Sequence, residues 1–405
     1  MGAKQKIGII GGGPAAMILA CFIDTERYDV TIYEKNNVLG RKFLVAGNGG
    51  FNLTHSESLD YFKNKYVPIE FLEKHLQQFS NTHLMTWLES LGIKTFIGSS
   101  KRVFPIKGIK PIEVLNAIKE KIRLNHVTIC FNHHWKKWHN NDLEFLVNNE
   151  THIIKTDITI FALGGSSWKV TGSDGLWTTS FKEKNIELNP FYPSNCAYQI
   201  QWDSHFINKH EGSALKNCVF TCGDVTIKGE AVLTQFGIEG SGIYPLSKNI
   251  RAELLNHQLY NQAQLYIDFK PDLSKEEITQ RFANKGNTSI KTWLEKKINL
   301  TTTQINLLKF LTSKEDYQNG EILIQFIKRY PLTLINTAPI DAAISTVGGI
   351  GLEELTENFE LKKLPNTFCI GEMLDWDAPT GGYLLQGCFT MGVSLARYLN
   401  QKAKL

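Results

Sequence analysis

The chain has 405 residues, of which 42% are hydrophobic and 21% charged, values typical of a folded globular protein. Lysine and arginine number 44 against 40 aspartate and glutamate, so a formal net charge of +4 gives no reason to expect a nucleic-acid or membrane partner. No apolar run reaches the roughly 18–20 residues that span a bilayer, and the glycines and proline near the start do not fit a secretion signal. We therefore expect a cytoplasmic protein.

The cysteines and histidines show no metal or disulfide pattern. Seven cysteines are scattered along the chain, without a Cys-x-x-Cys pair. His133, His134 and His139 lie close together, but no cysteine or carboxylate at ligand spacing accompanies them. We expect reduced thiols and no metal site. The lack of Cys-x4-Cys in the first third also argues against a disulfide reductase.

The first 35 residues predict a strand, a turn, a helix and a second strand. Residues 5–10 are mostly apolar and lead into a glycine turn with Pro14. Residues 15–23 suit a helix, and residues 30–33 are β-branched and aromatic, as in strands. This order within about 30 residues is typical of a βαβ unit.

Further along, residues 68–91 predict helices, and another helix begins at Pro111 with an apolar side formed by Ile112, Leu115, Ile118 and Ile122. Residues 127–163 predict short strands. The close spacing of the middle ones indicates an antiparallel meander, inserted before a buried strand at 158–163.

Residues 190–335 differ in character from what precedes and follows them. Short strands come first, and a helical part follows at about 272–330, where Ser274 with Glu277 and Thr301 with Gln304 have capping-box spacing. Afterwards the chain returns to glycine-rich strand–loop–helix patterns. We therefore predict a discontinuous nucleotide-binding domain over 1–189 and 336–405, with an insert domain over 190–335.

The turn after the first strand carries a dinucleotide-binding fingerprint, Gly11-x-Gly13-x-x-Ala16. The first glycine permits the tight turn, the second lets the backbone approach a pyrophosphate, and Ala16 allows close helix–strand contact. Glu34 ends the second strand, where a carboxylate accepts hydrogen bonds from ribose hydroxyls and repels a 2′-phosphate. Besides these residues, the predicted cofactor-binding set here includes Pro14, Ala15 and Lys35.

The fingerprint alone does not separate FAD from NAD, but the segment 40–54 favours FAD. It contains too much glycine for a helix and can run along an extended dinucleotide. We expect Arg41 and Lys42 to lie near phosphate and the glycines to lie against a flat ring. The predicted contacts are Gly40, Arg41, Lys42, Asn48, Gly49, Gly50 and Asn52.

The C-terminal part also favours FAD. A short strand at 368–372 ends in Gly371-Glu372, whose carboxylate suits a ribityl hydroxyl. Gly381-Gly382 then precede a helix over 383–399, whose N-terminus suits the flavin N1/O2 edge, where negative charge grows on reduction. Asp375 either contacts the cofactor or caps a turn, and Tyr383 faces either the flavin or the core. The predicted contacts are Gly371, Glu372, Asp375, Gly382, Tyr383 and Leu384.

Three segments, 40–56, 346–353 and 371–385, resemble the bacterial family of NAD(P)/FAD-dependent oxidoreductases that includes the BaiN and aminoacetone-oxidase-like flavoproteins. The motifs are Gly-Arg-Lys-x-Leu at 40–44 and Gly-Glu-x-Leu-Asp with Thr-Gly-Gly-Tyr at 371–383. The family's glycine loop commonly reads Ser-Gly-Gly-Gly-Arg-Cys-Asn, whereas this chain has Ala46 to Asn52 without the arginine and cysteine. That departure indicates a less characterised branch, and substrate roles of the two missing residues do not carry over. A second likeness, Thr234 to Ser241, has Gln235, Glu239 and Ser241 where the family usually has His, Ser and Pro.

The resemblance implies an α/β fold: a two-dinucleotide-binding, Rossmann-like FAD domain of the glutathione-reductase type, with an inserted small β-barrel and helical part. By analogy with that fold, the backbone near Trp135 would contact adenine, and Ala162 to Gly164 would lie beside the pyrophosphate.

His55 follows the proposed flavin loop. Its ordinary pKa suits a general acid or base, but a histidine here also serves to fix a loop by hydrogen bonds. No other catalytic residue is indicated.

These observations predict an FAD-dependent oxidoreductase with a small-molecule substrate. No second Gly-x-Gly-x-x-Gly of suitable spacing follows a strand, so NAD(P)H as electron donor would dock transiently. Two alternatives stay open: a flavin-binding regulatory protein that recognises a partner without turnover, and an NAD-dependent dehydrogenase that uses the first βαβ unit alone.

Overall fold

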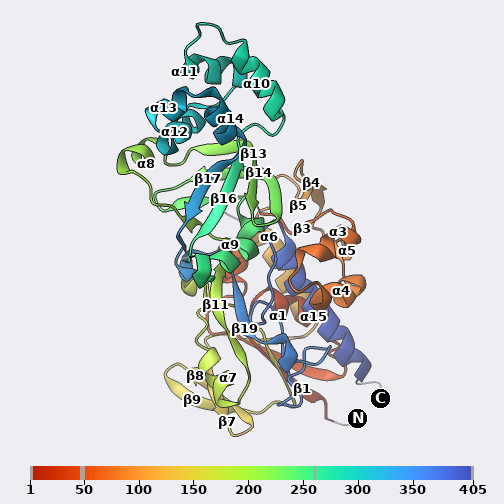
Figure 1. The fold of residues 1–405 in the computed structure, drawn as a ribbon. Helices are drawn as coiled ribbons and strands as arrows, with labels where there is room; N and C mark the ends of the chain where they lie inside the picture. The colour runs from red at the N-terminus through yellow and green to blue at the C-terminus, as the bar shows by residue number, and fades with distance from the viewer. Residues whose placement is uncertain (1–2, 46–50, 260, 403–405) are drawn as a thin grey trace. The chain divides into compact units, whose positions relative to one another are not determined.

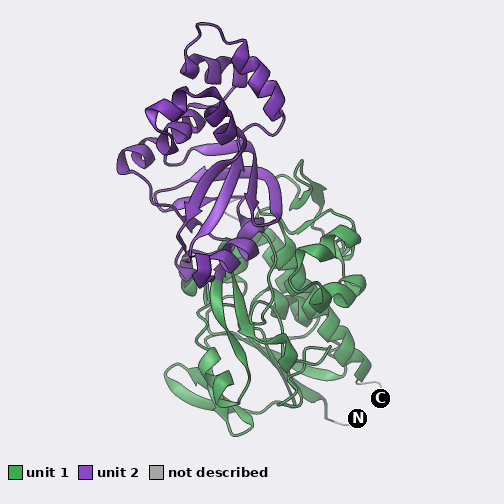
Figure 2. Ribbon diagram, in the orientation of Figure 1, with its two compact units in different colours: residues 1–192, 344–405 green, residues 193–343 purple. Residues whose placement is uncertain are grey.

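The computed structural model describes residues 3–45, 51–259 and 261–402. The chain forms two compact units (Figure 2). Unit 1 comprises Met1–Tyr192 and Ile344–Leu405, and unit 2 comprises Pro193–Ala343. Unit 2 ends at Ala343, further along the chain than residue 335, the predicted end of the insert domain. The strands at 330–337 complete the sheet of unit 2 and therefore belong to it.

Unit 1 is built on a five-stranded parallel sheet in the order β20-β10-β1-β2-β6. Ile9 of β1 pairs with Ile32 of β2 on one side and with Ile160 of β10 on the other. The central strands are apolar and buried, as expected of a parallel sheet covered on both faces. This arrangement is a Rossmann-type α/β fold. The strands are β1 Gln5–Ile10, β2 Tyr28–Tyr33, β6 Thr128–Cys130, β10 Ile158–Phe161 and β20 Thr367–Cys369.

Helix α1, Pro14–Phe22, packs closely against α15, Tyr383–Lys402, the last helix of the chain (Figure 1). Gly392 lies at their contact: a Cβ added there would lie 2.4 Å from Ile18 Cγ2 and 2.6 Å from the carbonyl oxygen of Ala15. The absence of a side chain at this position therefore allows the two helices to approach each other. The other helices of unit 1 are α2 Arg41–Val45, α3 Leu59–Phe62, α4 Ile69–Gln78, α5 Asn81–Ser90, α6 Pro111–Leu124 and α7 Thr178–Glu183.

Two details of the expected helices are wrong. The segment 40–54 is predicted to contain too much glycine for a helix, yet residues 41–45 form the short helix α2. A helix can form there because the other glycines of the segment come after residue 45. In α6 the buried side contains Val114, whereas Ile112 is 43% exposed. Ile112 lies outside the stripe because successive helical residues are rotated by about 100°.

Smaller sheets complete unit 1. The predicted meander is confirmed as the antiparallel sheet β7-β8-β9, directly before the buried strand β10. The antiparallel sheet β3-β5-β4 lies in the region between β2 and β6 along the chain, and β11 pairs with β19. The bounds are β3 Thr54–His55, β4 Thr95–Ile97, β5 Arg102–Pro105, β7 His134–His139, β8 Asp142–Val147, β9 Glu150–Ile154, β11 Leu188–Ser194 and β19 Ser345–Ile350.

Unit 2 contains a seven-stranded antiparallel sheet in the order β17-β16-β13-β14-β15-β12-β18. Its two ends, β17 and β18, are separated along the chain by Ile335 alone, and the backbone N–H of Ile335 donates to the carbonyl oxygen of Gln199 in β12. One extended segment therefore pairs with both ends of the sheet and closes it into a small barrel. The strands are β12 Tyr198–Gln199, β13 Ala214–Cys222, β14 Val225–Leu233, β15 Gly237–Glu239, β16 Ala263–Asp268, β17 Tyr330–Leu334 and β18 Asn336–Thr337.

The helical part of unit 2 follows β16. Both expected capping boxes are present: Ser274 caps α10 with Glu277, and Thr301 caps α12 with Gln304. Trp293 is fully buried among these helices and donates from Nε1 to the carbonyl oxygen of Arg281. The helices of unit 2 are α8 Ser204–His210, α9 Ser247–Leu254, α10 Lys275–Ala283, α11 Ile290–Trp293, α12 Thr302–Leu311, α13 Lys314–Gln318 and α14 Gly320–Lys328.

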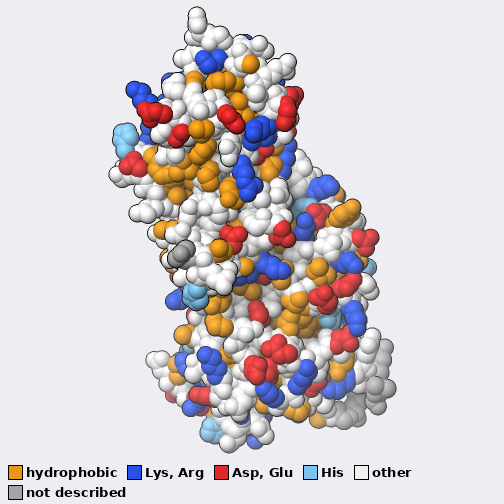
Figure 3. Space-filling model, in the orientation of Figure 1, with side chains coloured by type: hydrophobic (Ala, Val, Ile, Leu, Met, Phe, Trp, Pro, Cys, Tyr) orange, Lys and Arg blue, Asp and Glu red, His pale blue; other side chains and the backbone are white. Residues whose placement is uncertain are grey.

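Within the described residues, no helix is long and apolar enough to cross a membrane. All seven cysteines are free thiols. On the face of unit 1 drawn in Figure 3, basic and acidic side chains are interspersed.

The α1–α15 contact gives a first test. Gly392→Ala should lower the free energy of unfolding by about 1–3 kcal/mol, because overpacking strains a closed contact, even though alanine is the better helix former. Gln401→Ala, an exposed change in the same helix, should stay within about 0.5 kcal/mol of the unmodified protein. Chemical denaturation measures both, and equal stabilities would contradict the packing argument.

Candidate nucleotide-binding site

The turn between β1 and α1 presents its backbone at the carboxyl edge of the parallel sheet. Gly11 has φ +104°, and a Cβ there would lie 2.5 Å from the carbonyl oxygen of Ala162, just after β10. Gly13 is the N-cap of α1, with Pro14 in its first turn, and no atom of the described residues lies within 4 Å of a Cβ built at Gly13. As far as those residues go, the space in front of α1 is open, and backbone N–H groups at a helix start favour an anion. Ala15 and Ala16 are buried behind the turn.

Glu34 lies directly after β2 and is only 7% exposed. Its Oε2 accepts a hydrogen bond of 2.7 Å from the backbone N–H of Gly12, and its Oε1 accepts bonds from the backbone N–H and the side-chain amide of Asn36 at 2.8 and 2.7 Å. No cation among the described residues forms an ion pair with it. These donors hold the carboxylate against the glycine turn, and the amide of Asn36 occupies an oxygen that a ligand hydroxyl would otherwise reach.

Asn36 links Glu34 to the following basic residues. Its side-chain oxygen accepts a 2.8 Å bond from Arg41 Nη1, at the start of α2. Lys35 forms an ion pair of 2.6 Å with Asp174. The sequence analysis missed Asn36 and Asp174. The only sequence signal for Asn36 was its position two residues after Glu34.

Lys42 connects the two chain segments of unit 1. Its Nζ lies 3.1 Å from Glu372 Oε2 and 3.0 Å from Ser167 Oγ. Gly371, with φ +87°, lies against α1: a Cβ there would lie 3.3 Å from that of Ala15. The structure thus brings the predicted C-terminal Gly-Glu pair to the predicted N-terminal fingerprint. Gly40, with φ +70°, joins this group through its N–H, which donates to the Gly12 carbonyl oxygen.

The loop after β10 lies beside the same turn. A Cβ at Gly164, which has φ +75°, would lie 3.1 Å from Ser173 Oγ. Ser173 is 6% exposed, and its hydroxyl has no hydrogen-bond partner among the residues that the structure describes. A Cβ at Gly172 would lie 2.9 Å from Asn36 Nδ2, so this loop extends from the glycine turn to the carboxylate of Glu34.

Trp135 is placed differently from the other predicted residues. Its ring is buried in β7, with ring centroids 4.7 Å from Phe161 and 5.0 Å from Trp138, and its Nε1 has no hydrogen-bond partner within the described part of the chain. The backbone that meets Glu34 comes slightly earlier, where the N–H of His133 donates to the Glu34 carbonyl oxygen. The predicted adenine contact at Trp135 stays a prediction.

A second group of residues surrounds the start of α15. Gly381 and Gly382 have φ +109° and +100°, and a Cβ at Gly382 would lie 2.5 Å from the Cα of Thr54. The glycine pair therefore lets α15 begin against β3. Tyr383 is 5% exposed and its hydroxyl donates to Glu57 Oε2 at 2.9 Å, while Leu384 is half-buried.

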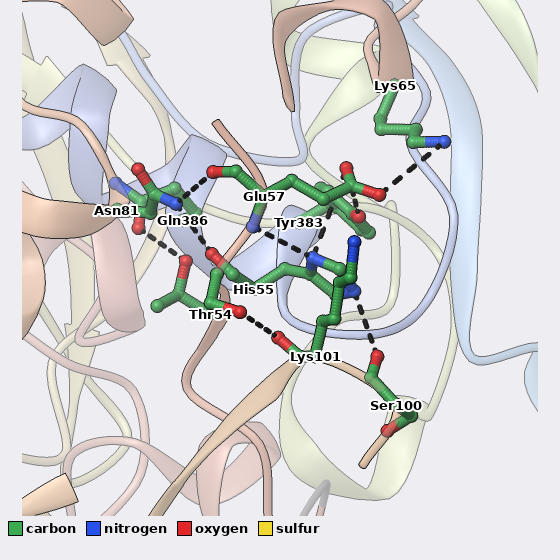
Figure 4. Close-up of polar contacts among 10 residues, drawn as sticks. Thr54, His55, Glu57, Lys65, Asn81, Ser100, Lys101, Tyr383 and Gln386 are labelled. Atoms are coloured by element: carbon green, nitrogen blue, oxygen red, sulfur yellow. Dashed lines mark hydrogen bonds and ion pairs between the residues drawn. The ribbon is translucent and has the colours of Figure 1, made fainter. Parts of the chain in front are cut away.

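His55 stacks on Tyr383, with ring centroids 5.1 Å apart (Figure 4). Its Nδ1 accepts from the backbone N–H of Glu57 at 3.3 Å, and its Nε2 lies 3.2 Å from the carbonyl oxygen of Ser100. Because a carbonyl only accepts, the proton belongs on Nε2. Both ring nitrogens are thus engaged by backbone, an arrangement that favours the loop-fixing role over acid–base catalysis.

The remaining predicted residues lie apart from these contacts. Asp375 uses both oxygens within the fold, accepting from the N–H of Gly348 at 2.9 Å and from Asn189 Nδ2 at 2.7 Å. It therefore ties β11 to β19. Asn52 is half-buried before β3. The predicted contacts Asn48, Gly49 and Gly50 lie outside the described residues.

The protonation of His55 gives a pH prediction. Burial lowers its pKa below the ordinary 6.5, and the carboxylate of Glu57 opposes that shift. At a pH between the lowered pKa of the folded protein and the ordinary pKa of the unfolded chain, His55 binds a proton only when the chain is unfolded. The stability that neutral His55 contributes is therefore present at neutral pH and is lost as the pH falls through this range. His55→Asn should flatten the pH dependence of the unfolding free energy between pH 5 and 7.5, by at most about 1.4 kcal/mol per pH unit.

His139→Asn is the matched control, since that side chain is 56% exposed. It should keep the slope of the unmodified protein. An unchanged slope in the His55 variant would show that His55 is not held neutral.

Comparison with known proteins places the chain among relatives of similar length. It is 25% identical to a 3-dehydro-bile acid Δ(4,6)-reductase from Clostridium scindens, over 97% of this chain and 98% of the relative. It is 20% identical to a ribosomal RNA dihydrouridine synthase from Haemophilus influenzae, over 97% and 98%. The solved structure of a 3-ketosteroid Δ1-dehydrogenase from Sterolibacterium denitrificans shares the fold, with a TM-score of 0.54, 12% identity and coverage of 98% and 100%.

The HI0933-like protein Rossmann domain matches residues 5–398, almost the whole described chain. The parallel sheet, the glycine turn and the buried acid after β2 agree with that match. This chain belongs to the HI0933-like family.

Proposed function

We infer that this protein is an FAD-dependent oxidoreductase that transfers a hydride between FAD and a carbon–carbon bond next to a carbonyl group. The observation that carries the proposal is the meeting of both ends of unit 1 at one edge of the sheet. The glycine turn with Glu34, and the Gly371-Glu372 pair with the start of α15, suit the two ends of one extended dinucleotide.

Three features of the described residues fit FAD. The space in front of Gly13 suits a pyrophosphate at the N-terminus of α1. The buried hydroxyl of Ser173 lacks a partner, next to Gly164. Glu34 is a buried carboxylate that no described cation pairs with, so it can accept hydrogen bonds from ribose hydroxyls. Since a carboxylate has about four acceptor positions and three are used, binding both ribose hydroxyls requires the Asn36 amide to release Oε1.

Each residue then has a role in holding the cofactor. Glu34 would accept from the adenosine ribose, and its charge would repel a 2′-phosphate. Lys42 lies between Glu372 and Ser167, so it would hold Glu372 toward the ribityl chain while adding a positive charge beside the phosphates. The first N–H groups of α15 would donate to the flavin pyrimidine edge.

Bound FAD would supply two-electron transfer as hydride, with NAD(P)H as a transient donor. The substrate class is supported by two relatives whose names both describe saturation of a double bond conjugated with a carbonyl group: a 3-dehydro-bile acid reductase and a dihydrouridine synthase. Because a bile acid and ribosomal RNA differ so much in size, we carry over the bond type and not the molecule.

The first experiment identifies the cofactor. Purified protein incubated with FAD and desalted should retain a flavin spectrum, and mass spectrometry should identify FAD. Anaerobic mixing with NADH and with NADPH should then bleach the flavin, and a 3-oxo-4-ene steroid or uridine should restore its colour. Protein that retains no flavin would overturn the proposal. A bound flavin that neither nicotinamide reduces would favour the regulatory alternative.

Glu34→Arg tests the ribose contact. We expect the dissociation constant for FAD to rise about ten- to a hundredfold, because hydrogen bonds to a charged group contribute about 1.5–3 kcal/mol and the new cation has no partner. Glu26→Arg reverses an exposed charge elsewhere in unit 1 and should leave binding unchanged. Titration by flavin fluorescence measures both. Equal affinities would refute the role of Glu34.

A further inference from the structure

Arg102 carries a positive charge that no described side chain neutralises by contact. It begins β5, opposite His55 in the register with β3, and its side chain is half-buried. Within the described chain its guanidinium makes neither a hydrogen bond nor an ion pair. A partly buried guanidinium without a carboxylate is unusual, because desolvation of a charge is unfavourable unless a partner compensates it.

The guanidinium lies at the start of α15. A Cβ built at Gly381 would lie 3.4 Å from Arg102 Nε, so a larger residue there would crowd the arginine. Gly382 approaches the backbone of Thr54 even more closely. The glycine pair thus places the positive end of a 20-residue helix beside a full positive charge on β5.

Glu57, an acid beside the start of α15, is already engaged. Glu57 accepts from the hydroxyl of Tyr383 at 2.9 Å, and Lys65 Nζ lies 4.0 Å from its other oxygen (Figure 4). Burial lowers the pKa of His55, which stacks on Tyr383, so this side chain favours its neutral form. The charge of Arg102 acts on the first residue of α15. Burial and Glu57 raise the pKa of Tyr383, whereas Arg102 lowers it.

We propose that Arg102 supplies the fixed positive charge that stabilises reduced flavin at its N1–C2 carbonyl edge, and so sets the midpoint potential of the cofactor. The proposal rests on the proposed function, in which the start of α15 faces that edge. Two-electron reduction places negative charge there, so a nearby cation favours the reduced form. Glu57, one hydrogen bond from Tyr383, opposes this effect. Arg102 and Glu57 therefore act on the potential with opposite signs.

Midpoint potentials measured by dye equilibration on FAD-loaded protein test this. Arg102→Met should shift the potential to a more negative value, and Arg102→Lys, which keeps the charge, should restore most of the difference. Glu57→Gln should shift the potential to a more positive value, because the amide oxygen still accepts from Tyr383 while the negative charge is removed. Lys101→Met removes an exposed charge from the adjacent residue and should leave the potential unchanged.

Opposite shifts in the two variants support the proposal, since a general loosening of the site would not reverse sign between them. An unchanged potential in Arg102→Met, or shifts in the same direction, would overturn it while leaving FAD binding intact. Wild-type protein without flavin would instead overturn the proposed function. If Arg102→Met does not retain FAD, the midpoint potentials of Arg102→Lys and Glu57→Gln decide. A potential of Arg102→Lys close to wild type, together with a more positive potential of Glu57→Gln, supports the proposal. Any other result contradicts it.

Discussion

The pairing of β20 with β10 is the interaction on which the rest of unit 1 depends. The strand comes from the far side of unit 2 in the chain, yet Phe368 pairs in parallel with Ile160 and extends the sheet begun by β1. That register fixes where Gly371 and Glu372 emerge, at the same sheet edge as the glycine turn. It also directs α15 onto α1, where Gly392 permits close contact. The ion pair between Lys42 and Glu372 depends on this addition, because no local sequence signal would bring the two residues together.

Three buried or half-buried acids in the site are compensated in three different ways. Glu34 receives only neutral donors, Glu372 has the cation of Lys42, and Glu57 has a tyrosine hydroxyl with a more distant lysine. A charge held by neutral donors stays available to a further polar partner, whereas one held by a close cation is locally neutralised. Under the proposed function, this distribution would give the adenosine end a fixed negative group, and at the start of α15 the charge of Arg102 would add to the positive end of the helix. An asymmetric cofactor with hydroxyls at one end and growing negative charge at the other suits this polarity.

Local patterns predicted most of the fold, whereas contacts over long sequence separations were not predictable. The βαβ unit, the meander and both capping boxes depend on residues within a few positions of each other, so their periodicity and spacing sufficed. The Gly-Glu pair of the C-terminal strand was proposed from its motif, but its ion pair with Lys42 depends on sheet order. Arg102 and Glu57 lie in an ordinary hairpin and loop, and nothing in their neighbours distinguishes them. Asp375 was singled out from its motif, and its contacts with β11 and β19 likewise depend on residues far away in the chain.

The adjacency of β11 and β19 has a consequence for how this architecture changes over evolution. The chain leaves unit 1 through β11 and re-enters it through β19, and these two strands are hydrogen-bonded neighbours. Exit and entry points are thus separated by about one interstrand spacing, roughly 5 Å. The barrel of unit 2 closes through its own segment 330–337 and needs no strand from elsewhere. A module attached in this way can be lengthened, trimmed or exchanged without altering the register of the parent sheet, so unit 2 can change during evolution while the candidate site of unit 1 is retained.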